Sequence, residues 1–182
     1  IVLAAGRGTR MKSELPKALH PIGGKPMVAC VLDTARQLGA ERIHVVVGHG
    51  ASQVSDAVGA PDVEIYIQSR QLGTGHAALQ AAPSCHADST VLILFGDVPL
   101  LSADVLADVV SAAETQPTLL AARLEDPAGY GRVIRSEDGD FARVVEQKDG
   151  LPHELEVTEV NTGVLAARGR ELVAWLGQVK ND

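Results

Sequence analysis

The chain has 182 residues, a formal net charge of −7, and a composition that is 46% hydrophobic and 21% charged. This length suits one domain with a sizeable core, and the composition is ordinary for a globular protein. The acidic balance and the 3% aromatic content exclude a general nucleic-acid-binding protein. Phosphate backbones require a broad basic surface, and single-stranded bases require aromatic stacking platforms.

No apolar run approaches the length of a membrane span, and no segment resembles a signal peptide. Cys30 and Cys85 are too few for a disulfide framework and lack the spacing of metal ligands. We therefore expect a cytoplasmic protein with no membrane partner. The chain opens at Ile1 inside an expected strand and closes after a helical pattern, so we expect a fragment truncated at both ends.

Strands and helices alternate over the first two thirds of the chain. The expected strands are residues 1–3, 43–47, 63–67, 91–95 and 118–124. The expected helices are residues 27–38, 52–58, 76–82 and 102–115. This alternation predicts an α/β fold, a Rossmann-like, doubly wound and mostly parallel sheet.

The alternation of strands and helices ends after residue 124. Residues 132–135 and 141–146 predict an antiparallel hairpin around Asp138-Gly139. A loop at residues 148–152, a strand at 160–166 and a closing helix at 169–179 follow. Because the sequence shows no interdomain linker, we predict a single domain over residues 1–182. Its sheet should be mostly parallel, with an antiparallel hairpin added.

Three unusual loops, residues 4–25, 68–75 and 96–101, leave the carboxyl ends of expected strands. Ligands of open α/β sheets bind at such ends. The first loop is long and basic, because Leu3–Met27 holds five Arg or Lys residues against Glu14 alone. A site at this edge should therefore accept a negatively charged ligand.

The first loop has the glycines and cations of a polyphosphate site. Gly6 and Gly8 let backbone N–H groups approach phosphate oxygens, and Arg10 and Lys17 can reach different phosphates. It is not a dinucleotide fingerprint, because Met11 stands where the third glycine belongs, and Pro26 after Gly24-Lys25 excludes a Walker loop. The alternative is a surface loop with solvated charges.

Asp97 directly follows an expected buried strand, beside Gly96, and is a candidate Mg2+ ligand. A helix-capping or turn aspartate is an equally common explanation of that position. No His or Cys residues form a spaced zinc cluster with carboxylates, and the chain has no Ser-His-Asp or Cys-His arrangement.

The remaining polar candidates lie at other strand ends. In the second loop, the amides of Gln68 and Gln71, Thr74 and the backbone of Gly73 suit the edge of a nucleobase, or else cap the next helix. Further along the chain, Glu146 and Asn161 could hold sugar hydroxyls, or could be ordinary polar residues at the ends of surface strands.

Five motifs together carry a family resemblance. LAAGRGTRMKSELPK (Leu3–Lys17) resembles the nucleotide-binding signature of the sugar-1-phosphate nucleotidyltransferases. The match is narrowed by QLGTGHA (Gln71–Ala77), GDVPL (Gly96–Leu100), DPAGYGR (Asp126–Arg132) and EVNTG (Glu159–Gly163). Together they are similar to the uridyltransferase domain of the bacterial bifunctional N-acetylglucosamine-1-phosphate uridyltransferase/glucosamine-1-phosphate acetyltransferase family.

The resemblance implies an enzyme that makes UDP-N-acetylglucosamine and pyrophosphate from UTP and N-acetylglucosamine 1-phosphate, for cell-wall and lipopolysaccharide precursors. It implies Mg2+ as cofactor, with Asp97 as a ligand, and Arg10 and Lys17 as the catalytic cations. The implied nucleotide-binding residues are Leu3, Ala4, Ala5, Gly6, Gly8, Thr9, Lys17, Gln68, Gly73 and Thr74. The implied sugar-binding residues are Gly131, Glu146 and Asn161.

The family also carries features that we expect to lie beyond Asp182. These are a second Mg2+ ligand, an asparagine, and a left-handed β-helix that holds the acetyltransferase and builds a homotrimer. We therefore expect this segment to be monomeric and without acetyltransferase activity. Two alternatives stay open: a nucleotidyltransferase of the glucose-1-phosphate thymidylyl or uridylyl type, and a non-catalytic fragment that binds a UDP-sugar.

Overall fold

The structure is a computed structural model that describes residues 1–8 and 11–179. The chain forms two compact units. Unit 1 consists of Ile1–Thr118 and Leu165–Asp182, and unit 2 consists of Leu119–Val164. Within the described ranges, no helix has the length and apolar character that crossing a bilayer requires.

Unit 1 is built on a parallel sheet in the order β5-β4-β1-β6. The bounds of these strands are Val2–Ala4 (β1), Ile43–Val47 (β4), Val63–Ile67 (β5) and Thr90–Phe95 (β6). The last residues of β10 (Glu159–Arg168) pair antiparallel with β6, with Leu165 opposite Ile93. The predicted α/β fold with a mostly parallel sheet is confirmed.

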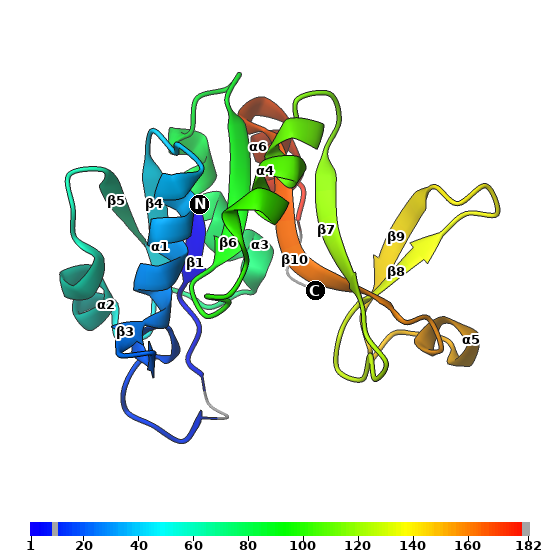
Figure 1. The fold of residues 1–182 in the computed structure, drawn as a ribbon, viewed down its shortest axis with the longest axis horizontal. Helices are drawn as coiled ribbons and strands as arrows, with labels where there is room; N and C mark the ends of the chain where they lie inside the picture. Colours follow the sequence, from blue (N-terminus) through cyan, green and yellow to red (C-terminus); the bar gives the residue numbers. More distant parts are fainter. Residues whose placement is uncertain (9–10, 180–182) are drawn as a thin grey trace. The chain divides into compact units, whose positions relative to one another are not determined.

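Helices cover both faces of this sheet (Figure 1). α1 (Met27–Gln37) and α4 (Ala103–Ala112) pack on one face, whereas α3 (Thr74–Ala81) and α6 (Gly169–Leu176) pack on the other. The remaining helical segments of unit 1 are α2 (Ala51–Val58), which packs on β4 and β5, η2 (Lys17–Leu19) and η3 (Ala82–Ser84).

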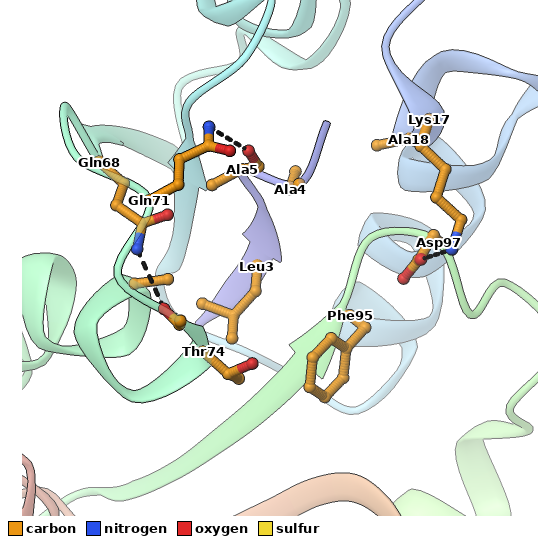
Figure 2. A pocket seen from close by; sticks show the side chains of 13 residues that line it. Leu3, Ala4, Ala5, Lys17, Ala18, Gln68, Gln71, Thr74, Phe95 and Asp97 are labelled. Atoms are coloured by element: carbon orange, nitrogen blue, oxygen red, sulfur yellow. Dashed lines mark hydrogen bonds and ion pairs between the residues drawn. The ribbon is translucent and has the colours of Figure 1, made fainter. Parts of the chain in front are cut away.

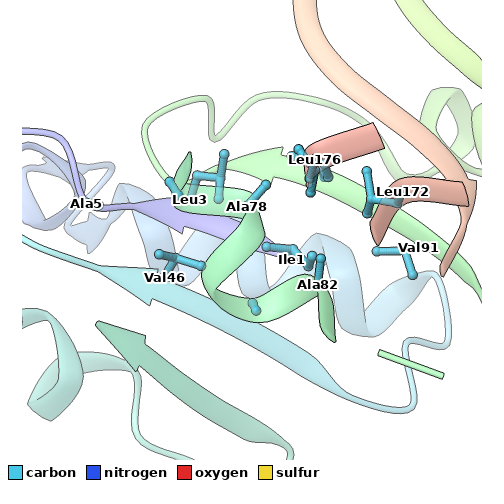
Figure 3. Packing of buried hydrophobic residues seen from close by; sticks show 12 residues of the cluster. Ile1, Leu3, Ala5, Val46, Ala78, Ala82, Val91, Leu172 and Leu176 are labelled. Carbon is cyan, nitrogen blue, oxygen red and sulfur yellow. The ribbon is translucent and has the colours of Figure 1, made fainter. Parts of the chain in front are cut away.

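The core of unit 1 follows from the alternation of side chains along each strand. Leu3 and Val46 face α3, and Val91 faces α6, in one apolar cluster that includes Leu172 (Figure 3). Val2 is buried as well, on the opposite face of β1. Because helices cover both faces, strands such as Ile43–Val47 are apolar without interruption.

The first loop is more regular than the sequence predicts. After η2, β2 (Pro21–Ile22) and β3 (Lys25–Pro26) form a two-stranded hairpin. Gly23 and Gly24, with φ of 56° and 82°, make its turn, a conformation that glycine adopts without the strain of a side chain. The expectation of a wholly irregular loop over residues 4–25 is wrong here, because two-residue strands are too short to show a period.

Unit 2 contains the predicted antiparallel hairpin, β8 (Arg132–Arg135) with β9 (Phe141–Val145). β8 also pairs with the first part of β10, and β7 (Thr118–Arg123) pairs with β10 as well. A single helical turn, α5 (Pro152–Leu155), follows the expected loop at 148–152 and overlaps its last residue. One turn is too short for apolar periodicity to predict it.

Candidate functional site

A pocket of about 310 Å³ opens in unit 1 beyond the carboxyl ends of β1, β5 and β6 (Figure 2). This volume is at the lower end of the range for small-molecule sites. It brings together ten of the residues singled out from the sequence with three others. The lining residues are Leu3, Ala4, Ala5, Gly6, Lys17, Ala18, Gln68, Gln71, Gly73, Thr74, Ala77, Phe95 and Asp97.

The wall formed by the end of β1 is mainly backbone. Leu3, Ala4 and Ala5 are nearly buried, whereas Gly6 is exposed. The Ala5 carbonyl accepts hydrogen bonds from the His49 backbone N–H at 3.3 Å and from Gln71 Nε2 at 2.8 Å. Small side chains therefore leave the main chain accessible, while two donors from other loops hold it in place.

This arrangement depends on a close approach at Gly48. A Cβ atom on Gly48 would lie 2.8 Å from both the Ala5 carbonyl oxygen and Gln71 Nε2. Side-chain carbons do not tolerate such distances, so any other residue at position 48 would push the two loops apart. The turn after β4 thus supports the pocket without lining it.

The wall formed by the loop after β5 is built on Gln68 and Gly73. Gln68 is only 4% exposed, and its backbone N–H donates to the Val47 carbonyl at 2.8 Å. Its Nε2 donates to the Gly73 carbonyl at 3.0 Å and lies 2.9 Å from Nδ1 of His76. Gly73 has φ of 93°, which favours glycine, and Thr74 begins α3 directly after it.

Lys17 and Asp97 form an ion pair across the pocket, through Nζ and Oδ2 (Figure 2). Both side chains stay accessible, with 35% of Lys17 and 26% of Asp97 exposed. The predicted phosphate-binding cation and the predicted metal ligand are therefore neighbours. In the protein without ligands, each neutralises the other.

The other predicted residues of the first loop have different positions. Gly8 does not line the pocket but packs on Lys17, since a Cβ on Gly8 would lie 2.7 Å from that of Lys17. Thr9 and Arg10 lie outside the described residues. The predicted role of Arg10 as a second cation on the triphosphate stays a prediction from the sequence.

Asp97 suits a divalent metal that arrives with a phosphorylated ligand. No group of three or more His, Cys, Asp or Glu residues that could hold a metal occurs in the described part of the chain. Mg2+ commonly binds through one or two carboxylates together with substrate phosphates and waters. A partly exposed carboxylate in a polyphosphate-sized pocket fits that mode.

The predicted sugar-binding residues lie together within unit 2. The Asn161 backbone N–H donates to the Gly131 carbonyl at 2.8 Å, and a Cβ on Gly131 would lie 3.2 Å from Glu146 Oε1. Asn161 Oδ1 accepts the Gly163 N–H at 2.8 Å. Within the described residues, the Glu146 carboxylate and the Asn161 Nδ2 group make no hydrogen bond, so both can bind a hydroxyl.

Sequence reasoning leaves several pocket residues without a role. Ala18, Ala77 and Phe95 line the pocket but carry no chemistry that a spacing argument could find. Gln71 is predicted to read the base, whereas its Nε2 instead holds the Ala5 carbonyl. His76 contacts Gln68 from the first turn of α3, and a polar helix-start residue gives no sequence signal for that contact.

The fold is an α/β sheet with a pocket at the carboxyl ends of its parallel strands, and comparison with known proteins gives the family. Residues 1–152 match the MobA-like NTP transferase domain. The chain therefore belongs to the MobA-like NTP transferase family. Membership implies nucleotide and phosphorylated substrates and a divalent metal.

Among curated proteins, the chain is 49% identical to the bifunctional protein GlmU of Cellvibrio japonicus and 50% identical to that of Pseudomonas aeruginosa. Each match covers all of this chain and 40% of the relative, so the chain spans about two fifths of the length of these relatives.

A solved structure is similar in fold. It is a Bacillus anthracis protein assigned as a glucose-1-phosphate thymidylyltransferase, in complex with a sucrose. The TM-score is 0.79 over 98% of this chain and 74% of that chain. At 16% sequence identity, this likeness shows the fold alone.

Proposed function

We propose that the chain transfers a uridylyl group from UTP to N-acetylglucosamine 1-phosphate, forming UDP-N-acetylglucosamine and pyrophosphate. The observation that carries the proposal is the pocket of unit 1, which combines an open backbone wall, an amide, a cation and a carboxylate. The identity of about half to the GlmU proteins supports the choice of nucleotide and sugar.

The base binds between the β1 wall and the loop after β5. Gln68 faces it with a carboxamide, and Gly73 offers a backbone N–H that makes no hydrogen bond within the described residues. Leu3, Ala4, Ala5 and Gly6 contact the nucleoside through their main chain. Thr74, at the start of α3, completes the nucleotide site.

The triphosphate is held by the first loop, with Lys17 as its principal described cation. Lys17 can pair with a phosphate oxygen of the nucleotide in place of Asp97, and Asp97 would then be left to hold a divalent ion. Arg10 binds a second phosphate, and Gly8 and Thr9 complete the binding of the triphosphate. This exchange keeps the pocket free of an unpaired charge in both states.

Asp97 would hold Mg2+, the divalent ion that accompanies nucleoside triphosphates. When bound, Mg2+ supplies positive charge that polarises the phosphate oxygens and neutralises the leaving pyrophosphate. The residues of the chain supply position and a second source of charge. Asp97 directs its carboxylate into the pocket from the end of β6, a rigid and buried strand.

The chemical step is an in-line displacement at the α-phosphorus of UTP. An oxygen of the sugar phosphate forms the new P–O bond as the bond to the bridging oxygen of pyrophosphate breaks. Negative charge grows on that bridging oxygen, where the Lys17 ammonium stabilises it. Because no bond to the protein forms, catalysis is positioning and charge neutralisation.

Unit 2 recognises the amino sugar. The Glu146 carboxylate accepts hydrogen bonds from sugar hydroxyls, and the Asn161 Nδ2 group donates one. Gly131 keeps the surface between them free of a side chain. We further propose that the segment acts in the cytoplasm, which its two free cysteines support, and that trimer formation and acetyl transfer belong to other parts of the longer relatives.

Pyrophosphate release tests the proposal directly. The chain is assayed with UTP, dTTP or CTP against N-acetylglucosamine 1-phosphate or glucose 1-phosphate, with and without Mg2+. We expect the highest kcat/KM for UTP with N-acetylglucosamine 1-phosphate and no activity without the metal. A preference for dTTP or glucose 1-phosphate would instead identify the thymidylyl or uridylyl type.

A second measurement separates the enzyme from a binding module. Calorimetry with UDP-N-acetylglucosamine reports binding without turnover. Binding together with no pyrophosphate release, even at high Mg2+, would contradict the catalytic proposal. Asp97→Asn should weaken the dependence of the rate on Mg2+, and an unaltered Mg2+ titration would count against Asp97 as ligand.

A further inference from the structure

His76 has no part in the proposed chemistry, yet its ring is joined to the base-reading amide. It is the third residue of α3, and its Nδ1 lies 2.9 Å from Nε2 of Gln68. Gln80, one turn later, donates from its Nε2 to the His76 carbonyl at 3.0 Å. The imidazole therefore contacts the pocket wall through Nδ1, while the carbonyl of the same residue is bonded within α3.

The donors of Gln68 can be counted. The Gly73 carbonyl can only accept, so the amide nitrogen of Gln68, and not its oxygen, must face it at 3.0 Å. Figure 2 shows this bond as the dashed line from the Gln68 nitrogen. The second hydrogen of the same nitrogen points to His76 Nδ1, which must then be the unprotonated, accepting nitrogen of the ring.

The tautomer that follows places the proton on His76 Nε2. Gln80 Nε2 lies 3.4 Å from that nitrogen, where two donors would face each other, so Gln80 bonds the His76 carbonyl and not the ring. Both hydrogens of Gln68 are now used within the protein. The carboxamide can offer only its oxygen to a ligand.

That oxygen is open to the pocket. Gln68 Oε1 accepts no hydrogen bond from the described residues. Every buried side-chain N or O atom among these residues has a hydrogen-bond partner, so an unbonded Oε1 is not buried. Oε1 is therefore accessible, and Gln68 lines the pocket. A base edge placed against this acceptor must carry an N–H group there.

We propose that His76 is a positioning residue that makes the pocket select uracil or thymine over cytosine. Uracil and thymine carry an N–H at ring position 3, whereas cytosine carries an unprotonated nitrogen that would repel Oε1. His76 fixes the carboxamide in the orientation that presents this acceptor. The inference rests on the proposed function in one respect, that a pyrimidine nucleotide occupies this pocket.

Three substitutions test the role of His76. His76→Leu keeps much of the volume and removes the acceptor, and His76→Ala serves the same purpose if the leucine variant does not fold. His76→Asn can place its Oδ1 where Nδ1 stood and so restore an acceptor. Gln80→Ala is the control within α3, because Gln80 hydrogen-bonds the His76 carbonyl and does not contact the Gln68 amide.

Calorimetry with UTP, dTTP and CTP in the presence of Mg2+ gives a readout independent of turnover. We expect the UTP-to-CTP affinity ratio to fall about tenfold in His76→Leu, the effect of loosening one buried hydrogen bond. The ratio should be retained in His76→Asn and in Gln80→Ala, and dTTP should follow UTP in every variant.

The outcomes separate this inference from the proposed function. A wild-type chain that binds none of the three nucleotides overturns the premise that a pyrimidine nucleotide occupies the pocket, and one that binds CTP as tightly as UTP and dTTP overturns the selectivity itself. A selective wild type whose ratio is unchanged in His76→Leu, with both affinities lowered equally, overturns the role of His76 alone. That role is also overturned if His76→Asn behaves as His76→Leu.

Discussion

The two units of this chain are stabilised in different ways, and the difference shows in their buried polar residues. In unit 1 these are His44 and Gln68, which are both uncharged, because burial lowers the pKa of His44. In unit 2 they are Arg132 and Glu154, which carry opposite charges. Unit 1 surrounds its polar residues with a large apolar core, whereas unit 2 builds part of its interior from ionised groups.

Three arginines of unit 2 make polar contacts, of which Arg132 is buried whereas Arg135 and Arg143 are 47% and 55% exposed. Arg132, 2% exposed, donates to the carbonyls of Tyr130 and Leu155 and to Gln147 Oε1. Arg143 pairs with the buried Glu154, and Arg135 pairs with Glu159 through two hydrogen bonds. Hydrogen-bonded charges of this kind fix geometry, but their stabilisation depends on every partner staying ionised and in place.

The comparison assigns each unit a task. In unit 1, the apolar core supports the strands whose ends line the pocket, and the pocket wall at the end of β1 is uncharged main chain. In unit 2, the buried Arg132 holds the glycine-bearing turn before β8 through the Tyr130 carbonyl, next to the predicted sugar-binding residue Gly131. Substitutions should therefore separate the two units by the type of interaction removed.

The largest effect on stability should come from the apolar core of unit 1. Leu172 is 2% exposed within the cluster of Figure 3, and Leu172→Ala leaves a cavity there. We expect the free energy of unfolding to fall by about 2–5 kcal/mol. Denaturant titration measures this loss, and Leu100→Ala, at a residue 80% exposed, is the control. A loss equal to that of the control would refute the packing described here.

Lys17→Met should affect turnover more than stability. It removes the described cation that contacts Asp97 and keeps the aliphatic stem that packs on Gly8. We expect kcat to fall about a hundredfold or more, the usual cost of one charge-stabilising donor, with a smaller change in the unfolding free energy. Lys12→Met, at an exposed position of the same loop, should keep kcat within about twofold. An equal loss of kcat in the two variants would show that Lys17 is an ordinary solvated surface charge.

Arg132→Met should destabilise unit 2 selectively. The substitution leaves the Tyr130 and Leu155 carbonyls without their described donor and Gln147 Oε1 with only the Gly129 N–H, which we expect to cost about 2 kcal/mol. Hydrogen exchange read by mass spectrometry should show faster exchange in residues 129–160 and unchanged protection of α3 and α6. Faster exchange throughout both units would show that their stabilities are not separable.

Much of the fold could be predicted because strong local signals coincide with it. The β-branched run Ile43–Val47, the apolar helical stripe ending at Gly39 and the Asp138-Gly139 turn each correspond to an observed element. The hairpin at Gly23-Gly24 and the single turn α5 could not be predicted. Their stability comes from contacts with other segments and not from the period of their own residues.

The candidate site was predictable for a different reason. Parallel strands end at one edge, so the loops that begin at Ala5, Gln68 and Gly96 had to meet, whatever their detailed conformation. The hydrogen bonds that hold the walls of the site in place were not predictable. The contact of Gln71 with Ala5 joins residues 66 positions apart, and the contact of His76 with Gln68 depends on the turn that Gly73 makes.

A smaller effect should follow from loosening the β1 wall. Gln71→Ala removes the 2.8 Å hydrogen bond to the Ala5 carbonyl and leaves only the longer one from His49. We expect KM for UTP to rise about fivefold, the value of one neutral hydrogen bond, with kcat nearly unchanged. Gln53→Ala, on the exposed side of α2, is the matched control. A lowered kcat at constant KM would instead show that Gln71 stabilises the transition state.

The smallest expected effect is that of lowering the pH, which should destabilise the two units in different pH ranges. Burial lowers the pKa of His44 in the folded chain. As the pH falls below about 6.5, the unfolded chain therefore binds a proton at His44 more readily than the folded chain does, and unit 1 loses stability. The pKa of Glu154 is lowered chiefly by the Leu151 N–H, and that of Glu159 by Arg135. Their stabilisation of unit 2 is complete above the ordinary glutamate value of 4.5 and is lost as the pH falls below it.

Hydrogen exchange across pH 7 to 3, corrected for intrinsic rates, should therefore show unit 1 amides losing protection in the upper range and the amides of residues 141–160 only in the lower. His44→Phe should narrow the upper window and Glu154→Gln should weaken the lower, whereas Glu156→Gln, at an exposed side chain, should change neither. Unit 1 has its own depressed carboxyl, since the Arg36 hydrogen bond lowers the pKa of Asp62, but these side chains are 39% and 35% exposed and water screens the pair. One window shared by both units would mean that they unfold as a single cooperative structure, and the contrast between an apolar and an ionic interior would then have no consequence for stability.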